Sequence, residues 1–242
     1  MSLFGPTFAD GDRLEVAGVT VRLKVHSRAR RVSLRLDRSR REFIATAPNP
    51  RRLGEAAAFA RQRADWITAR LAELPAVQTV APGETIEIFG QACRLELAKR
   101  GSGQSLPDIL AVRGEGAAYA RSVIRGIRSE AHRVLADRTA FYCGQLGVKL
   151  PSVTIMDAKG RWGSCRGGRP GTPAAIRYSW RLALAPFDVA DYVVAHECAH
   201  LIEQNHGPRF WDHVQALVGD PAPHRAWLRA HGLRLHAFGG DQ

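Results

Sequence analysis

The stretch VVAHECAHLIEQNHGPRFW, residues 193–211, contains the side chains of this chain that are best suited to chemistry. His196 and His200 are four residues apart, which on an α-helix places both imidazoles on one face, about 6 Å apart along the axis. Such a pair can bind one metal ion, with Zn–N distances of about 2.1 Å. Glu197 is the next residue after His196, so its carboxylate can reach a water activated by the metal without binding the metal itself. The H-E-x-x-H pattern therefore predicts two metal ligands and a general base.

A catalytic zinc site takes a third protein ligand and leaves its fourth position open. Glu203 and His206 compete for the third place. Glu203 lies two helical turns beyond His196, about 10 Å along the axis, and a straight helix cannot easily wrap three ligands round one ion. His206 falls at the expected helix exit, between Asn205 and Gly207, where the chain can turn back toward the metal. We prefer His206 as the ligand and assign Glu203 a supporting role beside a histidine.

The helix that carries this motif is expected to start near Pro186 or Asp188 and to run to about Gln204. Residues 189–202 are otherwise apolar over much of the helix surface, so the helix should be buried and its histidines should need partners. Before it, PSVTIMDAKGRWGSC and AAIRYSWRLALAP are predicted as two strands that flank the insert RGGRPGTP.

The first half of the chain alternates between strand and helix patterns. Residues 32–48 and residues 84–100 each predict a β-hairpin, and residues 109–116 predict one further strand. Apolar residues at spacings of three and four predict an amphipathic helix over residues 51–74 and a longer one over residues 117–145. We therefore expect an α+β protein. A β-rich N-terminal module of β-hairpin, helix and β-hairpin should occupy residues 1–115, and a catalytic domain should occupy residues 116–242.

The composition is that of a globular protein with a strongly basic surface, because the net charge is +12 at pH 7. Arginines concentrate in the stretch from Arg28 to Arg41. Such a run is usually a solvated surface, and nucleic-acid binding is its alternative reading. The cysteines form no C-x-x-C pair, which argues against a four-cysteine zinc site. Neither a signal peptide nor a membrane span is supported, so we expect a cytoplasmic protein with no membrane partner.

The segments RWGSC, WRLALAP, DYVVAHECAHL, NHGPRFW and RAWLRAHG occur in this order within residues 151–232. In sequence and separation they resemble the YgjP-like metal-dependent hydrolases, which are related to the SprT-like zinc metallopeptidases. The resemblance implies a zincin-like catalytic domain in which His196, His200 and His206 bind one Zn²⁺ ion and Glu197 activates water. It also implies that the RWGSC strand, with Trp162 and Ser164, lies along the active-site cleft, where its alternative role is to pack against the helix.

These residues predict a zinc-dependent metallopeptidase that hydrolyses peptide or protein substrates. Arg177, Tyr178 and His213 are candidates for stabilising the oxyanion, and Tyr178 is also a candidate cleft residue. Three alternatives remain open at this point. A metal-dependent nucleotide phosphohydrolase conflicts with the lack of a phosphate-binding loop. A DNA-associated protease of the SprT-like kind relies on the arginine run alone. A non-enzymatic zinc-stabilised adaptor would normally use four protein ligands, and only three are found.

Overall fold

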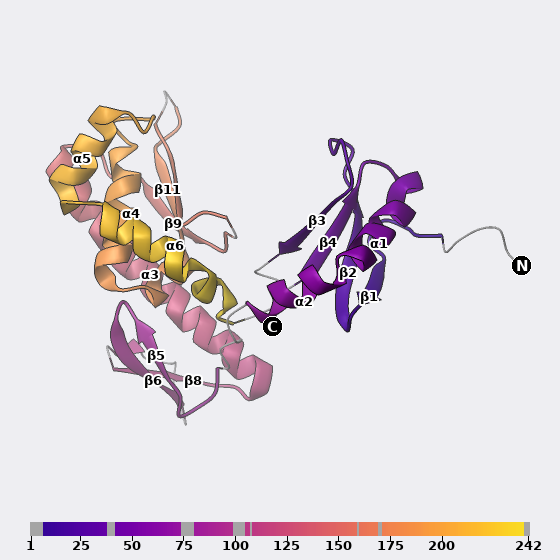
Figure 1. The fold of residues 1–242 in the computed structure, drawn as a ribbon. Helices are drawn as coiled ribbons and strands as arrows, with labels where there is room; N and C mark the ends of the chain where they lie inside the picture. Colours follow the sequence, from indigo (N-terminus) through magenta and orange to yellow (C-terminus); the bar gives the residue numbers. More distant parts are fainter. Residues whose placement is uncertain are drawn as a thin grey trace, which may run out of the picture. The chain divides into compact units, whose positions relative to one another are not determined.

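The structure is a computed structural model, and it describes residues 7–37, 42–73, 80–98, 105–106, 108–158, 160–168 and 171–239. The chain forms two compact units, and the division falls between residues 77 and 78. Figure 1 shows both units as ribbons. Each unit mixes helices with a small sheet or sheets, so the expected α+β class is confirmed.

The first unit is a four-stranded sheet with helices that follow it in the chain. Its strands have the order β1-β2-β4-β3, in which only the β2–β4 pair is parallel. The elements are β1 (Arg13–Val16), β2 (Val19–Val25), β3 (Ser33–Asp37), β4 (Glu42–Ala47), a 3-10 turn (Pro50–Arg52), α1 (Leu53–Gln62) and α2 (Ala64–Ala72). The predicted hairpin is the β3–β4 pair. The predicted helix of residues 51–74 is instead broken at Arg63, and the β1–β2 hairpin was not predicted.

The second unit begins with another small sheet, of order β5-β6-β8-β7, and continues into the longest helix of the described chain. Its elements are β5 (Thr85–Ile88), β6 (Gln91–Leu97), β7 (Ser105–Leu106), β8 (Ile109–Val112) and α3 (Gly116–Leu146). The predicted second hairpin is the antiparallel β5–β6 pair. Helix α3 stops at Gly147, whose φ of 65° lies in the left-handed region that glycine adopts without strain.

The expected domain boundary at residue 115 differs from the division that the structure shows. Leu110 and Val112 of β8 belong to the same hydrophobic core as Val123 of α3. Contact between strand and helix is close, because a Cβ added to Gly126 would lie 2.8 Å from Leu110 Cδ1. The hairpin is therefore part of the second unit. Its turn is also tied to the chain beyond α3, because the Phe89 N–H donates to the carbonyl of Ala183 at 2.7 Å.

The remainder of the second unit holds the residues of interest. Its elements are β9 (Ser152–Met156), β10 (Gly163–Arg166), β11 (Ala175–Ser179), a 3-10 helix (Trp180–Leu184), α4 (Phe187–Ala199), α5 (Pro208–Val218) and α6 (Ala222–Ala237). The sheet order is β10-β11-β9, so the predicted single strand over residues 151–165 is in fact two strands that pair with opposite sides of β11. The predicted strand over residues 174–186 contains β11 and then turns into the 3-10 helix. Residues 159, 169 and 170 of this region lie outside the described residues.

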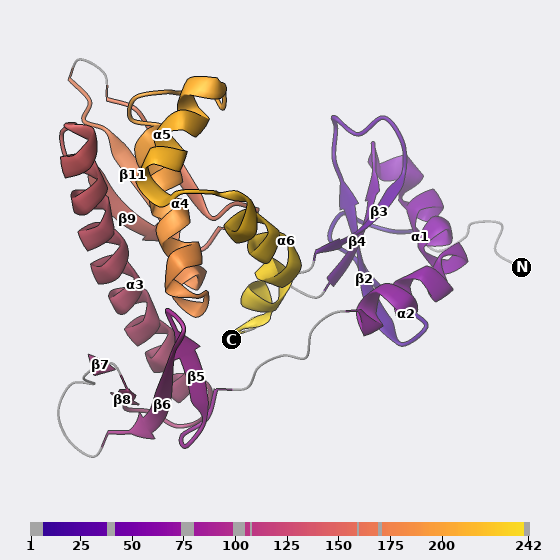
Figure 2. The ribbon, with the colours of Figure 1, turned by 60° about the vertical axis from the view of Figure 1, so that its left-hand side comes forward.

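Helix α4 is buried on nearly all sides, as its apolar sequence predicts, and α3 lies alongside it (Figure 2). A polar cross-link joins the two helices. Arg138 of α3 donates two hydrogen bonds to the carboxylate of Asp191, at 2.6 and 3.0 Å, and the hydroxyl of Tyr142 donates a third at 2.6 Å. These bonds hold α4 in register against the long helix.

None of the described helices combines the length and apolar character that crossing a membrane requires.

Candidate metal centre

Three histidines meet where α4 ends. His196 lies in the last turn of the helix, His200 is its C-cap residue and still has helical φ and ψ of −66° and −14°, and His206 lies in the loop before α5. One nitrogen of each imidazole lies within 4.8 Å of the other two. The Nε2 atoms of His196 and His206 are 3.2 Å apart. Two nitrogens that share a tetrahedral metal ion at about 2.1 Å would be about 3.4 Å apart, so this spacing suits a common ion.

The helix ends at residue 199, earlier than the predicted 204, and this ending is what brings the loop round. Backbone N–H groups of Ile202 and Glu203 both donate to the carbonyl of Ala199, at 3.1 and 2.9 Å, which closes the helix with a turn. Glu203 therefore no longer lies on the helix face. Its backbone carbonyl lies 3.0 Å from Nδ1 of His200, so a proton on that nitrogen leaves Nε2 free to bind a metal.

Phe210 forms the floor under the three imidazoles. Its side chain is completely buried, and its ring centroid lies 4.8, 4.4 and 4.7 Å from those of His196, His200 and His206. Proline at the start of α5, at position 208, turns the chain into the helix that carries this ring. The contact fixes where the loop histidine lies relative to the helical pair.

The environment of His196 and His200 favours their neutral form. Burial, together with the charges of His200 and His206, lowers the pKa of His196 to about 3, and burial also lowers the pKa of His200. Neutral imidazole is the form that binds a metal. His196 Nδ1 is buried and has no hydrogen-bond partner in the described structure. Three imidazoles whose nitrogens lie within 4.8 Å of one another are a donor set that fits a divalent first-row metal ion.

Glu197 is held beside this cluster but is not part of it. Only 6% of the residue is exposed, and burial raises the pKa of its carboxyl to about 7, against the opposing charge of Arg161. The side chain lies against β10, where a Cβ added to Gly163 would be 2.4 Å from Glu197 Oε1. The glycine of RWGSC is therefore the residue that lets the carboxylate approach the strand so closely.

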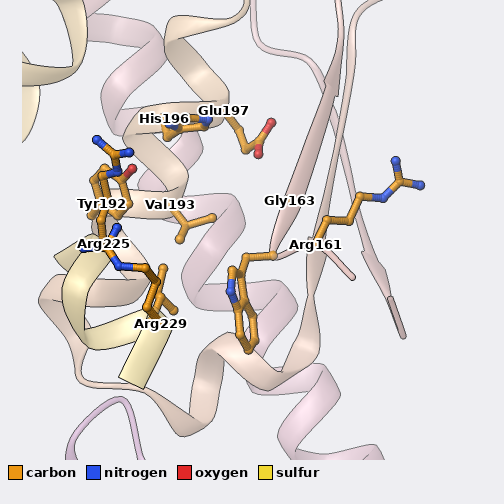
Figure 3. A pocket seen from close by; sticks show the side chains of 10 residues that line it. Arg161, Gly163, Tyr192, Val193, His196, Glu197, Arg225 and Arg229 are labelled. Atoms are coloured by element: carbon orange, nitrogen blue, oxygen red, sulfur yellow. The ribbon is translucent and has the colours of Figure 1, made fainter. Parts of the chain in front are cut away.

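A pocket of about 380 Å³ opens beside His196 and Glu197 (Figure 3). Helix α4 also contributes Tyr192 and Val193, and α6 contributes Arg225, Leu228 and Arg229. Residues 161–163, at the start of β10 and just before it, line the pocket as well. Tyr192 packs its ring 5.9 Å from that of His196. The α6 residues were not predicted to be site residues. The only signal in the sequence was the i, i+4 spacing of the two arginines within RAWLRAHG.

A family model described as YgjP-like, metallopeptidase domain matches residues 30–231. The chain belongs to the YgjP-like family. The resemblance identified from the sequence motifs is thus confirmed. A metallopeptidase domain indicates a metal-dependent hydrolase that acts on peptide bonds and implies a bound metal. No curated protein and no solved structure matches this YgjP-like chain.

The remaining candidate residues of the YgjP-like site lie in different surroundings. Trp162 lines the pocket, and its indole stacks on His236 with ring centroids 4.9 Å apart. Ser164 lies on β10 opposite Arg177 of β11. Tyr178 is fully buried in the core, where its hydroxyl lies 3.0 Å from Thr139 Oγ1.

None of the three candidates for stabilising the oxyanion lines the pocket. Tyr178 is enclosed by the core, Arg177 is exposed on β11, and His213 is half-buried on α5. The basic stretch from Arg28 to Arg41 belongs to the other compact unit, and its residues 38–41 lie outside the described residues. Neither the family match nor the described part of that stretch supports nucleic-acid binding.

Proposed function

We propose that this chain is a zinc-dependent metallopeptidase with a zincin-like active site, in which His196, His200 and His206 hold one Zn²⁺ ion and Glu197 is the general base. The observation that carries the proposal is the meeting of three imidazoles with a buried carboxylate beside them. Two imidazoles and the carboxylate come from the end of one helix, and the third imidazole comes from the loop that follows. This is the arrangement expected of a catalytic zinc site, which has three protein ligands and an open position.

The metal and the base would divide the chemistry between them. When bound, Zn²⁺ supplies Lewis acidity, which polarises a carbonyl and lowers the pKa of water. Glu197 accepts a proton from the attacking water at a carboxylate oxygen and returns it to the leaving amine. Its burial supports this role, because a carboxyl with a pKa of about 7 can both accept and donate a proton near neutral pH.

The position of β10 supports a peptide substrate. In the order β10-β11-β9, β10 is the outer strand of the described sheet, and its Gly163 touches Glu197. An outer strand offers unpaired backbone groups, to which an extended peptide can add as a further strand. A peptide bond aligned in this way would lie next to the proposed general base.

The proposal is tested by comparing the wild-type protein with the Glu197→Gln variant on an unfolded protein substrate. We expect the two proteins to carry the same amount of zinc by elemental analysis. The variant should hydrolyse the substrate about 10²- to 10⁴-fold more slowly, because it lacks the base. Wild-type protein that binds zinc but cleaves no peptide bond would refute the peptidase function, and an active variant would refute the role of Glu197.

A further inference from the structure

The pocket beside the metal centre has a cationic side, formed by α6. Arg225 and Arg229 are four residues apart on this helix, so they share one of its faces, and both line the pocket that His196 and Glu197 also line. Neither guanidinium forms an ion pair with a carboxylate among the residues that the structure describes. Figure 3 shows both arginines on the same side of the pocket as Tyr192, while Glu197 points to the other side.

Arg225 lies close to the metal centre. It lines the same pocket as His196, and the ring of its neighbour Trp211 has its centroid 6.0 Å from that of His196. The guanidinium stacks over the ring of Trp211, 4.8 Å from the centroid, which restricts where it can point. An anionic group bound here would therefore lie near the bond to be hydrolysed.

The rest of the lining is mainly apolar. Trp162, Val193 and Leu228 contribute hydrophobic side chains, and Glu197 is the one acidic residue among the described residues of the lining. The indole of Trp162 is held by α6, because a Cβ added to Gly232 would lie 3.0 Å from Trp162 Cζ2. Arg161 also lines the pocket, but Figure 3 shows its guanidinium directed away from Arg225 and Arg229. The group that fits combines an aliphatic part with a negative charge.

We propose that this pocket is a substrate subsite that selects a peptide carboxylate, which Arg225 and Arg229 bind. The inference rests on the proposed peptidase function and names its substrate class, peptides with a carboxylate next to the scissile bond. A guanidinium can bind a carboxylate through two parallel hydrogen bonds, which lysine cannot do. The carboxylate can come from an aspartate or glutamate side chain or from a free C-terminus, and the experiment separates these sources.

Binding is measured with zinc-loaded Glu197→Gln protein, so that no peptide is consumed. One set of peptides carries a single glutamate or glutamine at successive positions, and a second set has a free or an amidated C-terminus. We expect one carboxylate to strengthen binding about tenfold in calorimetric titration, a modest factor because both arginines are exposed to solvent. The set in which the preference occurs identifies the source of the carboxylate.

The preference should depend on the arginines of α6. In the Glu197→Gln protein, the second substitution Arg229→Gln should bring the ratio of the affinities for the acidic and neutral peptides close to one. Arg229→Glu in its place should favour a peptide with lysine at the same position. Arg125→Gln is the matched control, because Arg125 is an exposed helix arginine of the same unit that does not line the pocket. It should leave the ratio unchanged. Thermal unfolding of each variant shows whether the fold is intact.

Equal binding of the acidic and neutral peptides by intact protein would overturn the inference. It would also be overturned if a nucleoside triphosphate displaced every peptide in an Arg229-dependent way and was hydrolysed by the wild-type protein, since the pocket would then bind phosphate. The two proposals fail separately. An Arg229-dependent preference in a protein that cleaves no peptide would leave the subsite standing and refute the peptidase, whereas cleavage without preference would do the reverse.

Discussion

The two sides of the pocket are built differently. On the side of α4 and β10, the proposed general base Glu197 is buried and touches the strand at a glycine, and the helical ligands His196 and His200 are half-buried. On the side of α6, the two arginines that line the pocket are exposed. Catalytic groups need a fixed geometry, whereas a recognition surface tolerates small movements. The difference predicts that equal changes on the two sides have unequal effects.

The largest effect should follow loss of a metal ligand. His206→Ala removes one of the three imidazoles, so we expect metal affinity to fall by more than about 10²-fold. This is more than the loss that follows removal of a residue that only hydrogen-bonds to a metal ligand. Hydrolysis should be lost with the metal. Competition with a chelator measures the affinity. His213→Ala is the control, because this half-buried histidine of α5 lies outside the cluster. A His206→Ala protein that retains full metal content would rule out His206 as a ligand.

The second effect tests the close contact between Glu197 and β10. In Gly163→Ala the new Cβ would lie 2.4 Å from Glu197 Oε1, so the carboxylate must move. We expect kcat to fall about 10²-fold, the cost of a misplacement of about 1 Å, while metal content is retained. Gly160→Ala is the control, because a Cβ there meets nothing within 4 Å. Equal kcat values for the two variants would show that the position of Glu197 is not critical.

The third effect tests how helix α4 is held against helix α3. Asp191→Asn weakens the bonds from Arg138 and Tyr142, which also leaves the Arg138 charge without its partner. We expect the free energy of unfolding to fall by about 2 kcal/mol in urea titration. The comparison is Glu130→Gln, which disrupts the exposed pair with Arg133 and should cost less than about 1 kcal/mol. A smaller loss for Asp191→Asn than for Glu130→Gln would contradict the anchoring role.

The smallest effect should come from a glycine-to-alanine substitution on the α6 side of the pocket, the counterpart of Gly163→Ala on β10. In Gly232→Ala the new Cβ lies 3.0 Å from Trp162 Cζ2, so the indole needs to move by only a few tenths of an ångström. We expect KM to rise a few-fold and kcat to change little, because the binding surface shifts while the base stays in place. Steady-state measurement of kcat and KM for Gly232→Ala and Gly163→Ala compares the two sides of the pocket directly. A larger loss of kcat in Gly232→Ala would reverse the proposed division of roles.

The sequence predicted the local features well. Alternating residues predicted the β3–β4 and β5–β6 hairpins, and the periodic apolar residues predicted α3 to within about a residue at each end. These features depend on neighbours in the chain, so the sequence patterns report them. Where the prediction differed from the structure, contacts between residues far apart in the sequence determine the fold. Residues 151–165 form two strands because β11 pairs with both, and the β5–β6 hairpin joins the second unit because its sheet shares a core with α3.

For the site, the sequence by itself determined the residue types and the spacing that suit a metal and a base, because H-E-x-x-H on a helix is a local geometry. Only the tertiary structure decided what surrounds them. The burial of Glu197 against Gly163 and the meeting of all three imidazoles over Phe210 depend on how the elements pack. The arginines of α6 come to the pocket in the same way. Packing brings together residues that are remote in the sequence, and no local pattern records which ones will meet.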